Sequence, residues 1–224
     1  MKHIADDLTK IVESIQSAGG MNISEDYVMN ELRKIQSKVI DTTPKRFRSH
    51  LNDPIPDSTL DYLDNGQSIL ITGAVGSGKT TTAFAIGYQW TMRRAKKFYI
   101  DENAGANRHL SIPSIIIHFT TATEYLFDIR NSFNDGGAES VRGKLKNTRL
   151  LILDDLFASK ATDHVHEEII HLINERYQWE RPSILTSNKS IEEIADVDDR
   201  IASRLSEGLV LNFKSKPDFR IRKD

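Results

Sequence analysis

The chain has 224 residues, a length that suits one large domain or one core with a small appendage. It contains no cysteine, which excludes disulfides, thiolate metal sites and cysteine nucleophiles. Thirty lysines and arginines against 32 aspartates and glutamates give a formal charge of −2, so no chain-wide basic field attracts nucleic acid. The apolar stretches are too short to span a bilayer and no secretory signal is visible, so we expect a cytoplasmic protein without a membrane partner.

The first 43 residues carry two apolar stripes at helical spacing, separated by a Gly-Gly pair. The stripes consist of Ile4, Leu8, Ile11 and Ile15, and of Val28, Leu32, Ile35 and Val39. We predict a helical hairpin over residues 1–43 and a linker over residues 44–67 that leads into the core. The alternative is two helices packed on the core, because each helix has only one apolar stripe to bury.

From residue 68 onward, short apolar β runs alternate with helical segments. Strands are expected at Ser68–Thr72, Ile115–Phe119, Leu150–Leu153, Ser183–Thr186 and Leu209–Phe213, and helices at about 79–94, 122–134, 163–179 and 191–206. Residues 96–111 are polar and lack periodicity, which predicts a surface loop. Because the β runs are continuously apolar, they suit strands covered on both faces. The sequence therefore predicts an α/β core over residues 68–224, with a five-stranded parallel sheet flanked by helices.

A phosphate-binding motif follows the first expected strand. Residues 73–80 read GAVGSGKT, which is a complete G-x-x-x-x-G-K-[ST] pattern. The glycines let backbone N–H groups converge on phosphates, Lys79 reaches the β- and γ-phosphates, and the Thr80 hydroxyl can bind Mg²⁺. The predicted nucleotide site consists of Gly73, Ala74, Val75, Gly76, Ser77, Gly78, Lys79, Thr80 and Thr81.

Two carboxylates, Asp154 and Asp155, end the third expected strand. We expect this strand to lie beside the first one, with its carboxyl end pointing into the nucleotide cleft. Asp154 would then hold Mg²⁺, and Asp155 would orient or deprotonate the attacking water. The alternative is a core strand whose aspartates cap the next segment.

Three further polar residues follow the fourth expected strand. Asn188 can hold the attacking water or contact the γ-phosphate, or it is a turn residue. Arg200 and Arg204 are four residues apart, which places them on one face of a helix. An arginine supplied across a subunit boundary can neutralise a transferring phosphoryl group, whereas an ordinary exposed pair would bridge the nearby aspartates.

The order of these motifs, from about Phe47 to Phe219, resembles the DnaC/IstB-like branch of the AAA+ ATPases. That branch contains bacterial replicative-helicase loaders and the ATPase helpers of certain transposases. The matching segments read GAVGSGKT, LLILDDLF, ILTSNKSIEE, DRIASRLSEG and LVLNF. The resemblance implies an AAA+ core without a separate helical lid domain, ATP and Mg²⁺ as cofactors, and subunits that assemble into a ring or helical oligomer.

The resemblance also implies roles for the candidate residues. Asn188 looks like sensor 1, and Arg200 and Arg204 look like the arginine pair of this branch. One of the pair would act in trans on the neighbouring subunit's nucleotide and the other would lie nearer the bound nucleotide, and we favour Arg200 as the trans residue. Asp155 stands where many AAA+ proteins have glutamate, and its shorter side chain bears on the rate of hydrolysis.

Residues 120–140 are implied to face a central pore and to touch single-stranded DNA. Phe127, Arg130 and Phe133 would suit base stacking and phosphate contact. The alternative is a helix whose apolar residues form an ordinary core stripe.

The function expected from this resemblance is ATP-driven loading of a hexameric replicative helicase onto single-stranded DNA during replication, with residues 1–43 binding the helicase. The alternative within the branch is a transposition helper that binds DNA and recruits a transposase. These two functions differ in what residues 1–43 bind. A metabolic P-loop kinase is a third hypothesis, but it leaves Arg200 and Arg204 without a role.

Overall fold

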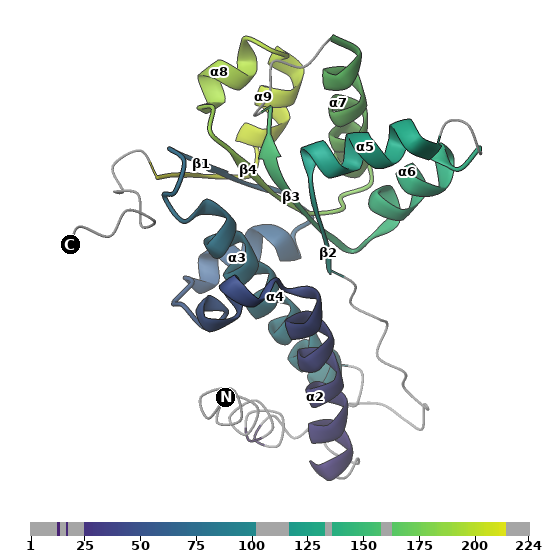
Figure 1. Cartoon of the computed structure of the whole chain (residues 1–224). Helices are drawn as coiled ribbons and strands as arrows, with labels where there is room; N and C mark the ends of the chain where they lie inside the picture. The colour runs from purple at the N-terminus through teal and green to yellow at the C-terminus, as the bar shows by residue number, and fades with distance from the viewer. Residues whose placement is uncertain are drawn as a thin grey trace, which may run out of the picture. The chain divides into compact units, whose positions relative to one another are not determined.

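The computed structural model describes residues 25–101, 117–132, 136–157 and 163–213, together with Glu13 and Ser17 (Figure 1). The predicted stripe of Ile4 to Ile15 and the residue Phe133 therefore lie outside the described residues. The chain divides into two compact units, each made of two segments. The first unit consists of Met1–Ser49 and Tyr88–Ile115, and the second of His50–Gly87 and Ile116–Asp224. Within the described part of the chain, no helix is long and apolar enough to cross a membrane.

The second unit is built on a parallel sheet with the strand order β2-β3-β4-β1-β5 (Figure 1). The strands are β1 Ile69–Thr72, β2 Ile117–Thr121, β3 Leu150–Leu156, β4 Ser183–Ser187 and β5 Leu209–Asn212. The five-stranded parallel sheet is confirmed, but β3 does not lie beside β1 as expected. The strand β4 lies between them, because it pairs with β1 on one side and with β3 on the other. Continuous apolar runs such as β3 and β4 both suit a central position, so hydrophobicity alone could not order them.

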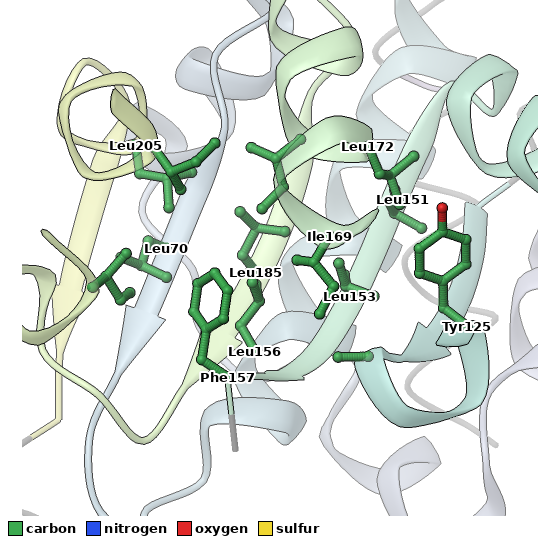
Figure 2. Packing of buried hydrophobic residues seen from close by; sticks show 14 of the residues in the cluster. Leu70, Tyr125, Leu151, Leu153, Leu156, Phe157, Ile169, Leu172, Leu185 and Leu205 are labelled. Atoms are coloured by element: carbon green, nitrogen blue, oxygen red, sulfur yellow. The ribbon is translucent and has the colours of Figure 1, made fainter. Parts of the chain in front are cut away.

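Helices cover both faces of this sheet. They are α3 Asp57–Asp64, the start of α4 Lys79–Asp101, α5 Ala122–Ser132, α6 Ala138–Asn147, α7 Asp163–Gln178, α8 Ile191–Ala195 and α9 Asp199–Ser206. Figure 2 shows the core on one face, where alternate side chains of the strands meet α5, α7 and α9. The labelled residues there include Leu70, Leu151, Leu153 and Leu185 from strands and Tyr125, Ile169, Leu172 and Leu205 from helices.

The opposite face of the sheet is covered by the first turns of α4. A Cβ atom added at Gly87 would lie 3.0 Å from Ile152 Cδ1, so this helix approaches β3 closely. Phe84 on the same helix contacts Phe119 of β2 in a tilted ring arrangement, with ring centroids 4.7 Å apart. Because Gly87 has no side chain, the helix that begins at the phosphate-binding loop can pack closely against the sheet.

The first unit contains α2 Glu25–Thr42 and the second half of α4. The second predicted stripe lies on α2, where Val28, Leu32 and Val39 are buried. Gln36 Nε2 donates a hydrogen bond of 2.8 Å to Tyr88 Oη of α4, so α2 is joined to that helix. One expectation is wrong here, because residues 96–101 continue α4 rather than form a loop. The segment predicted to link this part to the core contains α3 and a 3₁₀ helix, η1 Lys45–His50.

A buried arginine fastens the amino-terminal ends of β3 and β4. Arg176 on α7 is 1% exposed, and burial lowers the pKa of its guanidinium. Its Nη1 donates to the carbonyls of Leu145, Lys146 and Thr148, its Nη2 to the carbonyl of Pro182, and its Nε to Ser183 Oγ. The acceptors lie at the end of α6, in the residues between α6 and β3, and at the start of β4, so one side chain joins the segments that lead into both strands.

Candidate nucleotide-binding site

The phosphate-binding loop connects β1 to α4, as the motif predicts. Gly76 and Gly78 have φ angles of 78° and 93°. Residues with a side chain rarely adopt such angles, so the two glycines allow the turn of the loop. Ser77 is 1% exposed, and its Oγ is one of three buried side-chain oxygen or nitrogen atoms without a hydrogen-bond partner in the described part of the chain. The loop therefore offers a free hydroxyl at the start of a helix, where backbone N–H groups favour an anion.

Lys79 lies inside this loop and is 6% exposed. Its Nζ donates to the carbonyls of Gly73 and Ala74, each at 2.9 Å, and to Asn188 Oδ1 at 2.7 Å. Asn188 directly follows β4, so the order of strands brings the end of β4 against the loop. The structure therefore brings together two residues that are 109 positions apart in the sequence.

Asp154 on β3 faces the first turn of α4. Thr80 Oγ1 lies 2.9 and 3.0 Å from the two Asp154 carboxylate oxygens, and Thr186 Oγ1 on β4 donates to Oδ1 at 2.5 Å. Asp154 is 5% exposed, and burial raises the pKa of its carboxyl group although both hydroxyls lower it. A hydroxyl and a carboxylate in contact are the oxygen ligands that Mg²⁺ prefers, so Thr80 and Asp154 fit the predicted metal role.

A β-bulge lies at Asp155. Leu153 pairs with Leu185 and Leu156 pairs with Ser187, so β3 has one residue more than β4 over this stretch. Asp155 has a φ of 58°, in the left-handed region that aspartate tolerates better than most residues. Asp155 is exposed whereas Asp154 is buried, so the bulge gives the two neighbouring carboxylates different surroundings.

The two candidate arginines lie on α9. Their side-chain hydrogen bonds end within residues 198–200, not on the phosphate-binding loop. The side chain of Arg200 is 75% exposed, and its Nη2 lies 2.8 Å from Asp198 Oδ2. The Arg204 guanidinium lies over the ring of Tyr177, 5.4 Å from its centroid. Arg204 also lines a cavity of about 330 Å³ with Gln67 and Ser68, beside the amino-terminal end of β1, whereas the phosphate-binding loop follows the carboxyl-terminal end.

The residues predicted to face a pore lie on two different faces of helix α5. Tyr125 and Ile129 are buried in the core, as an ordinary core stripe would be. Phe127 is 62% exposed, and Arg130, three residues further along, is also exposed. The exposed face of α5 therefore presents one aromatic ring and one guanidinium to solvent.

Two hydroxyl residues at the end of β4 contact β3 at the candidate site, which we did not predict. Thr186 and Ser187 are fully buried, and their hydroxyls bond to Asp154 and to the carbonyl of Leu156, respectively. The signal was present, because two adjacent hydroxyl residues end this strand. Their role depends on the bulge in β3, which no local pattern indicates.

Fold and site together define a P-loop nucleotide-binding protein with a parallel sheet. Residues 63–212 match the model of the bacterial DnaA ATPase domain, a stretch of more than half the chain. The chain therefore belongs to this family, and the expected AAA+ ATPase core is confirmed.

Solved structures with the same fold include replication proteins. The AMPPCP-bound DnaA from Aquifex aeolicus is 25% identical with a TM-score of 0.52, over 73% of this chain and 46% of that one. Domain III of the Thermotoga maritima DnaA is 23% identical with a TM-score of 0.53, over 72% and 61%. A DnaC helicase loader is 21% identical with a TM-score of 0.57, over 76% and 100%. This chain matches about half the length of a DNA replication initiation factor and of two DnaA structures that contain AMPPCP.

Proposed function

We propose that this protein binds ATP and hydrolyses it, and that it uses the cycle to load a hexameric replicative helicase onto single-stranded DNA. One observation carries the ATPase part: Lys79 Nζ lies 2.7 Å from Asn188 Oδ1, beside the contact between Thr80 and Asp154. A lysine, an amide, a hydroxyl and a carboxylate thus meet at the start of α4. These are groups with which P-loop NTPases bind phosphates and Mg²⁺ and hold the attacking water.

Each group has a distinct role in this proposal. The Lys79 ammonium would exchange its carbonyl acceptors for the β- and γ-phosphate oxygens, and Asn188 would hold the attacking water or the γ-phosphate. Thr80 and Asp154 would hold Mg²⁺, which neutralises phosphate charge when bound. The exposed carboxylate of Asp155 would orient the water or accept its proton.

The ATPase part is tested by Lys79→Ala, measured as binding of a fluorescent ATP analogue and as phosphate release. Binding and turnover should both fall, because the variant removes the cation that would contact the β- and γ-phosphates. Lys38→Ala is the matched control, since it removes an exposed lysine from α2. Parental binding and turnover by Lys79→Ala would refute the nucleotide site.

The loader part is supported by the likeness to the DnaC fold and by the exposed face of α5. We propose that Phe127 stacks on a base of single-stranded DNA and that Arg130 contacts phosphate. Residues 1–43 would bind the helicase, residues 44–67 would lead into the ATPase core, and residues 68–224 would form that core.

Binding of a fluorescent oligothymidine tests the DNA contact. Phe127→Ala should weaken binding, by about 1–3 kcal/mol for one stacked base. Trp179→Ala is the matched control, because Trp179 is 64% exposed and lies directly after α7 rather than on α5. Equal affinities of the two variants would contradict the proposed DNA contact.

Helicase loading is tested with the replicative helicase of the same host and a closed circle of single-stranded DNA. The full-length protein should place the helicase on the circle only when ATP is present. Capture of a transposase by residues 1–43 in place of the helicase would favour the transposition helper.

A further inference from the structure

The bulge in β3 leaves a backbone group of Asp155 without its usual partner in the sheet. Between the pairs Leu153–Leu185 and Leu156–Ser187, two residues of β3 face the single residue Thr186 of β4. An extra residue in a bulge is not paired by the ladder, and a buried N–H without an acceptor is costly. Here the side chain of Thr186 supplies the acceptor, because the Asp155 N–H donates to Thr186 Oγ1 at 3.0 Å.

The same hydroxyl also holds the other carboxylate residue. Thr186 Oγ1 donates its single proton to Asp154 Oδ1 at 2.5 Å, and Thr80 of α4 contacts the same carboxylate. Thr186 is completely buried, so water does not compete for these bonds. One hydroxyl is therefore both acceptor and donor, and it joins the backbone of Asp155 to the carboxylate of Asp154.

We propose that Thr186 is a positioning residue of the ATPase site. It fixes the left-handed backbone of Asp155, which keeps that side chain exposed, and it orients the Asp154 carboxylate towards Thr80. This inference rests on the proposed function, because it assigns Asp154 to Mg²⁺ and Asp155 to the attacking water. Thr186 itself touches neither nucleotide nor metal in this proposal.

The test compares Thr186→Val with Thr186→Ser and Ser187→Ala. Valine has nearly the shape of threonine but no hydroxyl, whereas serine keeps the hydroxyl. Ser187→Ala is the matched control, because the Ser187 hydroxyl donates at 2.8 Å to the carbonyl of Leu156 and contacts neither aspartate. Each full-length variant is measured for thermal unfolding, for affinity to a fluorescent ATP analogue with Mg²⁺ or with EDTA, and for kcat and KM.

Thr186→Val and Ser187→Ala should both lower the Tm, by roughly 3–10 °C, because each leaves a buried backbone group without its partner. Only Thr186→Val should reduce the gain in affinity that Mg²⁺ provides, and only it should lower kcat. Loss of an outer partner of a metal ligand typically changes affinity or rate by about 10- to 100-fold. Thr186→Ser should restore both quantities to within about threefold of the parent.

Equal Mg²⁺ dependence in Thr186→Val and the parent would overturn the positioning role, and so would equal impairment of the valine and serine variants. Failure of the proposed function has a different signature. In that case the parent itself would bind the analogue equally with Mg²⁺ and with EDTA, and Lys79→Ala would bind it equally well.

Discussion

The ionised carboxylate of Asp154 is expected to favour Mg²⁺ binding but to lower the stability of the folded protein. Its carboxylate is buried, and its pKa is raised mainly by that burial, so the ionised form costs stability at neutral pH. Asp154→Asn removes the charge and can keep hydrogen bonds to Thr80 and Thr186. We expect the Tm to rise by about 2–4 °C, as a gain of roughly 1 kcal/mol gives in a chain of this size, while Mg²⁺-dependent nucleotide binding is lost.

The pH dependence of that Tm difference checks the cause. Because the folded pKa of Asp154 lies above its unfolded value, the advantage of Asp154→Asn should fade as the pH falls through the raised pKa. Asp198→Asn is the opposite control, since the Arg200 side chain lowers the pKa of Asp198. That variant should lose stability at neutral pH, and the loss should shrink as acid protonates Asp198 in the parent. A Tm rise with Asp198→Asn would contradict this assignment.

Single residues at the nucleotide site were predictable where a motif states the chemistry. The loop motif predicted the positions of Lys79 and Thr80. Asp154 and Asn188 come from the carboxyl ends of adjacent parallel strands, so they lie at the same edge of the sheet. Thr186 was not predictable, because its role needs a bulge that only strand pairing creates. Arg176 was also missed, since a charged residue on a helix is exposed far more often than buried.

At the scale of elements, α2 supports the second half of α4. Tyr88 is 3% exposed, and Gln36 on α2 donates to its hydroxyl. Deletion of residues 1–43 should therefore lower the Tm but leave affinity for the ATP analogue unchanged, because Lys79, Thr80 and Asp154 belong to the other compact unit. Tyr88→Phe in the full chain isolates the hydrogen bond, which is worth about 1 kcal/mol. A truncated protein with the parental Tm would show that residues 1–43 are fully separable.

Long periodic elements were predicted better than short ones. The helix α6 was missed because only Ala138 and Leu145 of its residues are buried, too few to give a stripe. The single helix expected over residues 191–206 is two helices, α8 and α9. The signals for this break were present: Ser190 and Glu193 form a capping box, and Asp198 caps the second helix.

At the scale of the whole molecule, we expect an oligomer whose ATP site is shared between subunits. Arg200 is the better candidate for the trans arginine, because its side chain is 75% exposed whereas Arg204 packs on Tyr177. A trans arginine contributes about 10³–10⁵ in rate, so specific ATPase activity should rise with protein concentration. Lys79→Ala and Arg200→Ala, each inactive alone, should recover partial activity when mixed, since one kind of junction then has an intact site.

Arg204→Ala is the control for that mixing experiment. If Arg200 is the trans residue, Arg204→Ala should retain ATPase activity when assayed alone. Recovery with Arg204→Ala and none with Arg200→Ala would reverse the assignment. Activity that does not depend on concentration, without recovery from either mixture, would indicate a monomeric enzyme and contradict the shared site.

The acceptors of Arg176 have an evolutionary consequence. Four of its five hydrogen bonds end on main-chain carbonyls, which every amino acid provides, and only the bond to Ser183 needs a particular side chain. Positions 145, 146, 148 and 182 can therefore diverge among descendants of this gene without loss of the contact. Arg176 has no such freedom, because even lysine offers neither the planar fork nor five donors. We expect this position to remain arginine where the residues around it have drifted.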